Sequence, residues 1–138
     1  MGGMSRNKGK VGERELAALL SELTGHEVKR RVRNLAGEDD LAGLPGWSIE
    51  CKRYRQITPA LLAGWWAQAV EQARRINCLP LLVYRPDRGQ WRCRWPAALH
   101  AGAGHCLTDG DTVDADPAVW WALVRTTTTE ETPCTTCN

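Results

Sequence analysis

Phenylalanine is absent from this chain of 138 residues, and tyrosine and methionine occur only twice each. The aromatic part of any hydrophobic core must therefore come mainly from the seven tryptophans. Four of them lie in periodic segments: Trp65 and Trp66 in a helical pattern, and Trp91 and Trp95 in an alternating one. Such rings could stack on unpaired bases. We favour a role in the core or in a seam between two subunits, where aromatic residues are enriched.

Long apolar runs are also absent. No stretch of roughly 18 apolar residues is present, which excludes an ordinary membrane-spanning helix and predicts no membrane partner. The first six residues lack the apolar segment of a signal peptide, so we expect a cytoplasmic protein. The length suits one compact domain and is too short for two.

A complete cysteine motif for binding zinc is missing as well. Cys134-x-x-Cys137 has no second Cys-x-x-Cys to complete a zinc site, and the other cysteines are scattered at positions 51, 78, 93 and 106. We therefore expect reduced and mostly buried thiols.

Charge is distributed unevenly along the chain. Residues 1–100 contain 17 Lys and Arg against 10 Asp and Glu, a net charge of +7. Residues 101–138 contain one Arg against six acids, a net charge of −5. A basic body with an acidic end indicates a polyanionic partner, of which nucleic acid is the obvious one.

The periodicity predicts one α/β domain with a central mixed β-sheet flanked by helices. Residues 1–10 are expected to form a flexible basic arm, residues 11–125 the folded domain, and residues 126–138 a disordered tail. The expected helices are Val11–Thr24, Pro59–Asn77 with Thr58 as its cap, and Asp116–Arg125. The expected strands are Glu27–Arg33, Trp47–Tyr54, Leu79–Tyr84 and Gln90–Trp95, whereas residues 101–115 are expected to form a loop.

The segment Ile49-Glu50-Cys51-Lys52 carries the clearest chemical signal. Alternate side chains of a strand share a face, so Glu50 and Lys52 point one way while Ile49 and Cys51 can enter a core. Asp40, ten positions upstream, could bring a second carboxylate to the same metal ion. Two oxygen ligands for a hard divalent cation, with a lysine near the attacked phosphate, are the parts needed to hydrolyse a phosphodiester.

A third acid lies in the first predicted helix. At 100° per residue, Glu13 falls about 70° from the centre of the leucine stripe. It is therefore the acid closest to the buried face on one flank of that helix.

These segments together resemble a known family. Glu13-Arg14-Glu15-Leu16, Asp40-Leu41-Ala42-Gly43 and Ile49-Glu50-Cys51-Lys52 are similar to the motifs of the PD-(D/E)xK nuclease superfamily, with a restriction-endonuclease-like core. Within it, the chain resembles the archaeal-type Holliday junction resolvases, which phages also carry. The later segments Leu79–Tyr84 and Gly89–Arg92 resemble two further strands of that family.

The resemblance implies roles for particular residues. Asp40 and Glu50 would hold Mg²⁺, which Mn²⁺ could replace, with Glu13 orienting the metal or water and Lys52 placing the nucleophile. The family's proline before the aspartate is replaced by Asp39, so Asp39 could be the ligand instead. The expected DNA contacts are Lys8, Lys10, Arg14, Arg30, Arg31, Arg33 and Arg53.

The sequence therefore predicts a Mg²⁺-dependent DNA endonuclease, a homodimer that nicks opposing strands of a four-way junction. Two alternatives remain open. One is a nuclease of the same superfamily that cuts flaps, nicked duplex or plain duplex. The other is a catalytically inactive DNA-binding module with the same fold.

Overall fold

The computed structural model describes residues 2–32, 39–102, 108 and 110–130, and these form a single small α/β domain. The elements follow in the order α1 (Gly2–Thr24), β1 (Lys29–Arg30), β2 (Leu41–Ala42), β3 (Trp47–Tyr54), α2 (Pro59–Arg75), β4 (Leu79–Pro86), β5 (Arg92–Pro96), the 3₁₀ turn η1 (Ala97–His100), β6 (Thr112–Ala115) and α3 (Pro117–Glu130).

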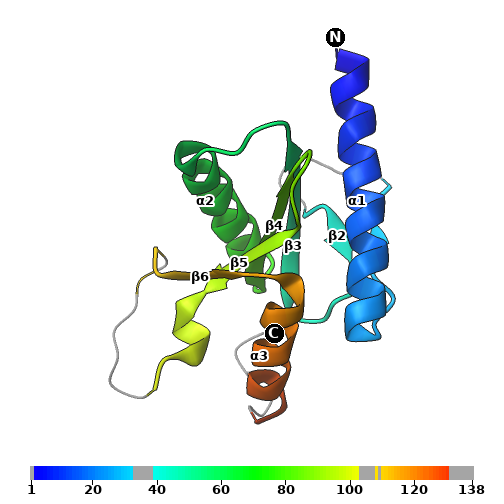
Figure 1. The fold of residues 1–138 in the computed structure, drawn as a ribbon. Helices are drawn as coiled ribbons and strands as arrows, with labels where there is room; N and C mark the ends of the chain where they lie inside the picture. The colour runs from blue at the N-terminus through cyan, green and yellow to red at the C-terminus, as the bar shows by residue number, and fades with distance from the viewer. Residues whose placement is uncertain (1, 33–38, 103–107, 109, 131–138) are drawn as a thin grey trace.

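The six strands form one sheet in which their spatial order is their order in the chain. The central strands β3 and β4 are parallel, in a register that pairs Glu50 with Leu82 and Lys52 with Tyr84. All other neighbours are antiparallel. A parallel pair needs a long return connection, which α2 provides by running back along the sheet (Figure 1).

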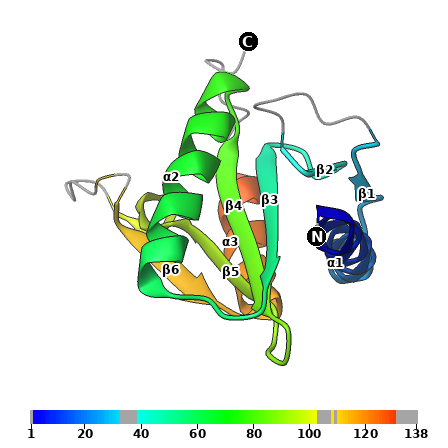
Figure 2. The ribbon, with the colours of Figure 1, turned by 90° about the horizontal axis from the view of Figure 1, so that it is seen from above.

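Helices cover both faces of the sheet, as Figure 2 shows for α2 on one side and α1 on the other. On the α1 face, Leu16 and Leu20 pack with Ile49 and with Trp120 of α3, all without solvent exposure. On the α2 face, a second cluster joins Trp65, Trp66 and Ala69 to Leu82 and Tyr84 of β4. The predicted fold class is therefore confirmed.

The tryptophans are used in the interior of the single chain. Six of them, at positions 47, 65, 66, 91, 95 and 120, are at most 7% exposed. Their expected place in a core is confirmed, and none of these six is left over for a seam between subunits.

The structure reproduces the sequence prediction where local signals are strong. Strand β3 has the predicted bounds, and α2 begins at Pro59 after Thr58, whose side chain accepts a hydrogen bond from the Leu61 N–H at 3.2 Å. The three described cysteines, at positions 51, 78 and 93, are free. Cys106, Cys134 and Cys137 lie outside the described residues.

Several predicted boundaries differ from those of the structure. Helix α1 begins at Gly2, so residues 2–10 of the expected arm are helical; no proline interrupts them, and extending a packed helix costs far less than starting one. Helix α3 continues to Glu130, into the expected tail. The expected loop 101–115 ends in strand β6, which hydrogen bonds to β5 and covers the edge of the sheet. Within the described residues, no helix is long and apolar enough to cross a membrane.

Candidate active site

The β2–β3 hairpin brings Asp40, Glu50 and Lys52 together. The Asp40 N–H donates to the Ile49 carbonyl at 2.9 Å, which fixes Asp40 beside the middle of β3. The Asp40 carboxylate Oδ2 accepts the Cys51 N–H at 2.8 Å, so the side chain is held against the same strand. Lys52 Nζ lies 3.5 Å from Glu50 Oε1, two positions along the same face. The predicted alternation of β3 is confirmed, because Ile49 and Cys51 pack on the opposite face.

The Glu50 carboxyl group is buried, and the Asp40 carboxyl group beside it is half-buried. Glu50 is 4% exposed, and burial followed by the charge of Asp40 raises its pKa to about 8, against the lowering effect of Lys52. Burial also raises the pKa of Asp40, although the hydrogen bond from Cys51 opposes this shift. The site therefore holds more negative charge than the surrounding protein compensates.

Asp39 and Asp40 are separated by their partners. Asp39 is 4% exposed, and its Oδ1 lies 2.7 Å from Arg31 Nε, so this carboxylate is neutralised inside the protein. Asp40 faces Glu50 and Lys52 instead. Of the two neighbours, only Asp40 is placed to share a cation with Glu50.

Glu13 approaches the pair from α1. Its pKa is raised by burial first and then by the charge of Asp40, which shows that the two carboxylates are close. Glu13 Oε2 lies 2.6 Å from Arg30 Nε, a partner that lowers its pKa. Glu13 is therefore held by Arg30, within range of the charge of Asp40.

The donor set suits a hard divalent cation. Glu50 Oε2 is buried without a hydrogen-bond partner among the described residues, and a carboxylate oxygen in that state is costly unless a cation approaches it. Asp40 adds a second carboxylate, and Mg²⁺ binds through one or two carboxylates plus waters and substrate oxygens. Within the described residues, no three His, Cys, Asp or Glu side chains come together as a metal site.

Three of the five predicted DNA contacts whose side chains the structure describes form ion pairs with acidic residues. Arg30 is paired with Glu13 and Arg31 with Asp39, while Arg53 lies 3.6 Å from Glu15 and 3.7 Å from Asp87. Lys10 and Arg14 are exposed on α1. The side chain of Lys8 and the whole of Arg33 lie outside the described part of the chain.

The network around Glu15 was not predicted. This carboxylate accepts hydrogen bonds from the Arg85 guanidinium and from the Trp91 Nε1–H, the latter at 2.9 Å. Arg85 also lies over the Trp91 ring, 5.7 Å from its centroid. The network fixes α1, and with it Glu13, to the ends of β3, β4 and β5. The position of Glu15 at the side of the leucine stripe in the first predicted helix is the one sequence signal that could have indicated this network.

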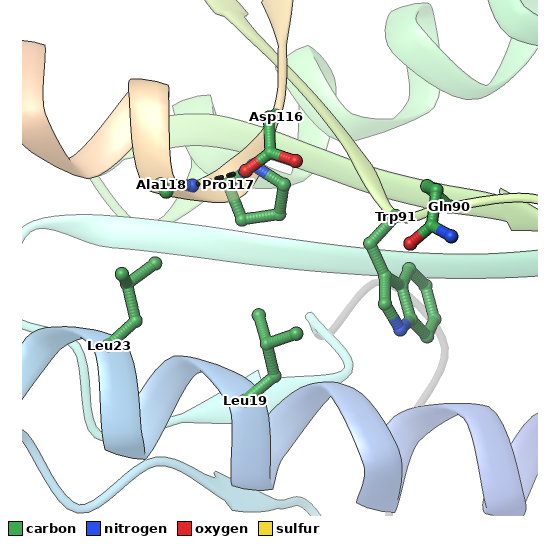
Figure 3. A pocket seen from close by; sticks show the side chains of 7 residues that line it. All are labelled: Leu19, Leu23, Gln90, Trp91, Asp116, Pro117 and Ala118. Atoms are coloured by element: carbon green, nitrogen blue, oxygen red, sulfur yellow. Dashed lines mark hydrogen bonds between the residues drawn. The ribbon is translucent and has the colours of Figure 1, made fainter.

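A separate cavity of about 160 Å³ lies between α1, the start of β5 and the start of α3. Figure 3 shows its lining, in which Leu19, Leu23 and Trp91 provide the apolar walls and Asp116 caps α3 by accepting the Ala118 N–H at 2.9 Å. Leu19 and Trp91 belong to the core on the α1 face. The cavity is therefore separated by the sheet from Glu50 and Lys52.

The fold and this site define a class of protein: an α/β domain in which Glu50 and Lys52 share one face of the central strand β3 and Asp40 lies beside them, the arrangement of a nuclease. The comparisons with known proteins agree. Residues 4–101 match the family described as "Phage putative PDDEXK endonuclease", and the chain belongs to that family. The predicted PD-(D/E)xK relationship is thereby confirmed.

Two individual proteins are also similar. Protein D14 of Escherichia phage T5 is 30% identical over 108 residues, which cover 63% of this chain and 68% of that protein. The solved structure of Hjc, a Holliday junction resolvase from Archaeoglobus fulgidus, aligns over 88% of this chain and 96% of its own, with 18% identity and a TM-score of 0.48.

Proposed function

We propose that this protein is a divalent-metal-dependent DNA endonuclease that hydrolyses phosphodiester bonds in branched DNA, with four-way junctions as the preferred substrate and Mg²⁺ as the cofactor. The observation that carries the proposal is the Asp40–Glu50 pair, in which Glu50 is buried and Asp40 half-buried. Among the described residues Glu50 Oε2 has no hydrogen-bond partner, and Lys52 Nζ lies 3.5 Å from Glu50 Oε1. The motif resemblance to archaeal-type resolvases supports the junction preference.

The side chains divide the work of hydrolysis. Asp40 and Glu50 hold the metal, and Glu13, itself held by Arg30, orients water at the margin of the site. When bound, a divalent cation offsets the charge of the phosphate and makes water more acidic. Lys52, 3.5 Å from Glu50, stabilises the charge that develops on the phosphate oxygens. A water oxygen then bonds to phosphorus, the ester P–O bond breaks, and the leaving oxygen takes up a proton.

A catalytically inactive module is disfavoured by the energetics of the site. Two neighbouring carboxylates with raised pKa values cost stability in the free protein, and a purely structural domain gains nothing from them. A nuclease for other DNA substrates remains the second candidate. It is favoured by the burial of the tryptophans, because the surplus of aromatic surface that suggested a dimer is consumed within one chain.

The decisive experiment incubates the protein with a synthetic four-way junction and a linear duplex of matched sequence, each with Mg²⁺ and with EDTA. We expect Mg²⁺-dependent cleavage of the junction at least tenfold faster than cleavage of the duplex. Equal rates would select the second candidate. No cleavage of either DNA by the wild-type protein with Mg²⁺ or Mn²⁺ would contradict the nuclease itself.

A further inference from the structure

The partners of the basic side chains divide them into two groups. Eleven of the fifteen described lysines and arginines make an ion pair or another polar interaction. Within the described part of the chain, the four that lack a salt bridge are Lys10, Arg14, Arg55 and Arg88. Unpaired, exposed cations are the ones free to meet an outside anion.

These four cations lie at one end of the molecule. Arg55 directly follows β3, and Arg88 lies in the turn that follows β4, so both are at the carboxyl ends of the parallel strands (Figure 1). The first half of helix α1 also lies beside the carboxyl end of β3. A Cβ on Gly12 would lie 3.3 Å from the Arg53 Cβ, which places Lys10 and Arg14 near the end of β3.

A cleft of about 670 Å³ separates Arg55 from Arg88. Its lining consists of Arg55, Gln56, Pro86, Asp87, Arg88 and Gly89. The two walls are joined by a hydrogen bond from the Asp87 N–H to the Tyr54 carbonyl at 2.9 Å, and the turn is closed by one from the Gly89 N–H to the Pro86 carbonyl at 3.0 Å. The cleft is thus built on ordered backbone.

The single acid in the cleft does not cancel its charge. Asp87 Oδ1 lies 3.7 Å from Arg53 Nε, and the Arg85 guanidinium donates to the Asp87 carbonyl at 3.5 Å. The negative charge of Asp87 is therefore matched by Arg53, and the guanidinium groups of Arg55 and Arg88 remain available.

We propose that this cleft binds the DNA backbone and that Arg55 and Arg88 each contact a phosphate. The proposal rests on the proposed nuclease function and adds a contact surface to it. Five residues of extended strand separate Glu50 from Arg55, about 16 Å. That distance is about five base pairs of duplex rise. One DNA arm can therefore reach the cleft while presenting a phosphate to Glu50 and Lys52.

The test measures binding of the full-length protein to a fluorescent duplex in EDTA, over a range of salt concentrations. Each lost phosphate contact lowers the log–log salt slope by about 0.9. We therefore expect the double variant Arg55→Gln/Arg88→Gln to lower the slope by about 1.8. As the salt concentration rises from 50 to 200 mM, the wild type should lose about 12-fold more affinity than the variant.

The matched control is Arg74→Gln/Arg75→Gln. It removes the same charge from exposed positions at the opposite end, where α2 leads back into the start of β4. An equal fall in slope for this control would overturn the cleft as a local site, and so would an unchanged slope in the Arg55/Arg88 variant. The single Arg88→Gln change, with an expected fall of about 0.9, covers the case in which the double variant unfolds.

Failure of the proposed function gives a different result. If the wild-type protein binds DNA and the variants behave as expected, but no DNA is cut with Mg²⁺ or Mn²⁺, the cleft stands and the catalytic proposal falls. If the wild-type protein cuts DNA while the double variant keeps its slope, the catalytic proposal stands and the cleft falls.

Discussion

Asp39 and Asp40 are adjacent in the chain and identical in chemistry, yet their surroundings give them different roles. Asp39 is neutralised by Arg31 at 2.7 Å, whereas Asp40 faces Glu50. We predict that Asp40→Asn lowers the cleavage rate by about 10³-fold or more while DNA binding is retained, because a metal ligand is lost and several kcal/mol of transition-state stabilisation go with it. Asp39→Asn should retain cleavage but lower the free energy of unfolding by about 1–3 kcal/mol.

Single-turnover cleavage and urea denaturation on the same two variants separate these roles. The asparagine at position 40 can still accept the Cys51 N–H, so the fold of the hairpin is preserved. An active Asp40→Asn protein together with an inactive Asp39→Asn protein would show that the metal ligand is Asp39.

Glu50 makes the stability of the metal-free protein depend on pH. Its pKa is about 8 in the folded chain against an ordinary value of 4.5, so between these values the folded state holds a proton that the unfolded state has released. Stability from this group is present below about pH 4.5 and is lost as pH rises towards 8. We predict that Glu50→Gln, which cannot ionise, has a higher Tm than wild type at pH 8 in EDTA, by several degrees, and that the difference shrinks towards pH 5.

Thermal melts at several pH values measure this difference. Glu71→Gln is the matched control, because Glu71 is exposed and paired only with Arg74 and Arg75 on the surface of α2. A Tm difference for Glu50→Gln that stays constant from pH 5 to pH 8 would contradict the buried carboxylate pair as the source.

At the scale of elements, the carboxylate of Asp114 adds side-chain contacts that hold strand β6 to β4 and β5. Asp114 accepts hydrogen bonds from the Tyr84 hydroxyl at 2.5 Å and from Arg92 and Arg94 at 3.1 Å each. We predict that Asp114→Ala lowers the free energy of unfolding by about 2–4 kcal/mol, because two arginines and a tyrosine lose their shared partner. Urea denaturation measures this change.

Glu71→Ala is the comparison for that experiment. It removes an acid with two arginine partners from the exposed surface of α2, where such pairs contribute about 1 kcal/mol or less. Equal losses for the two variants would mean that Asp114 does no more than a surface ion pair.

The elements with strong local signals were predictable, and those defined by distant partners were not. The alternation of Trp47–Tyr54 and the Thr58-Pro59 helix start specify β3 and α2 without tertiary information. Strand β6 has only four residues, and its pairing with β5 depends on Asp114 meeting Arg94 across the sheet. The extra turns of α1 continue a helix whose stability comes from packing further along, which no signal in Gly2–Lys10 announces.

The candidate site was predictable to the same degree. The spacing of Glu50 and Lys52 on one strand face follows from the period of a strand, and the structure bears it out. The choice between Asp39 and Asp40 depends on which carboxylate meets Arg31, a contact between separate segments. The arginine partners of Glu13 and Glu15 could not be predicted for the same reason, since these contacts also join separate segments of the chain.

At the scale of the whole molecule, the homodimer remains a prediction supported by symmetry. Paired nicks in opposite strands of a junction need two active sites, and a two-fold axis supplies them. We predict a mass near 31 kDa by light scattering at micromolar concentration, about twice the 15.3 kDa of the chain. A mass near that of one chain, with and without junction DNA, would replace the resolvase by a nuclease that makes single nicks.

The order of the strands also bears on how the chain matures during synthesis. Each strand pairs with the next one in the chain, so the strands up to β3 can pair during synthesis without waiting for a distant partner. The parallel pairing of β3 with β4 has to wait until α2 has been made. Asp40 and Glu50 meet on an early hairpin, but Leu82, the neighbour of Glu50 across the parallel pair, is present only after β4 has been translated. A nascent chain that stops before Leu79 therefore lacks the strand that pairs with β3 beside Glu50, and the surroundings of this carboxylate are complete only when β4 has joined the sheet.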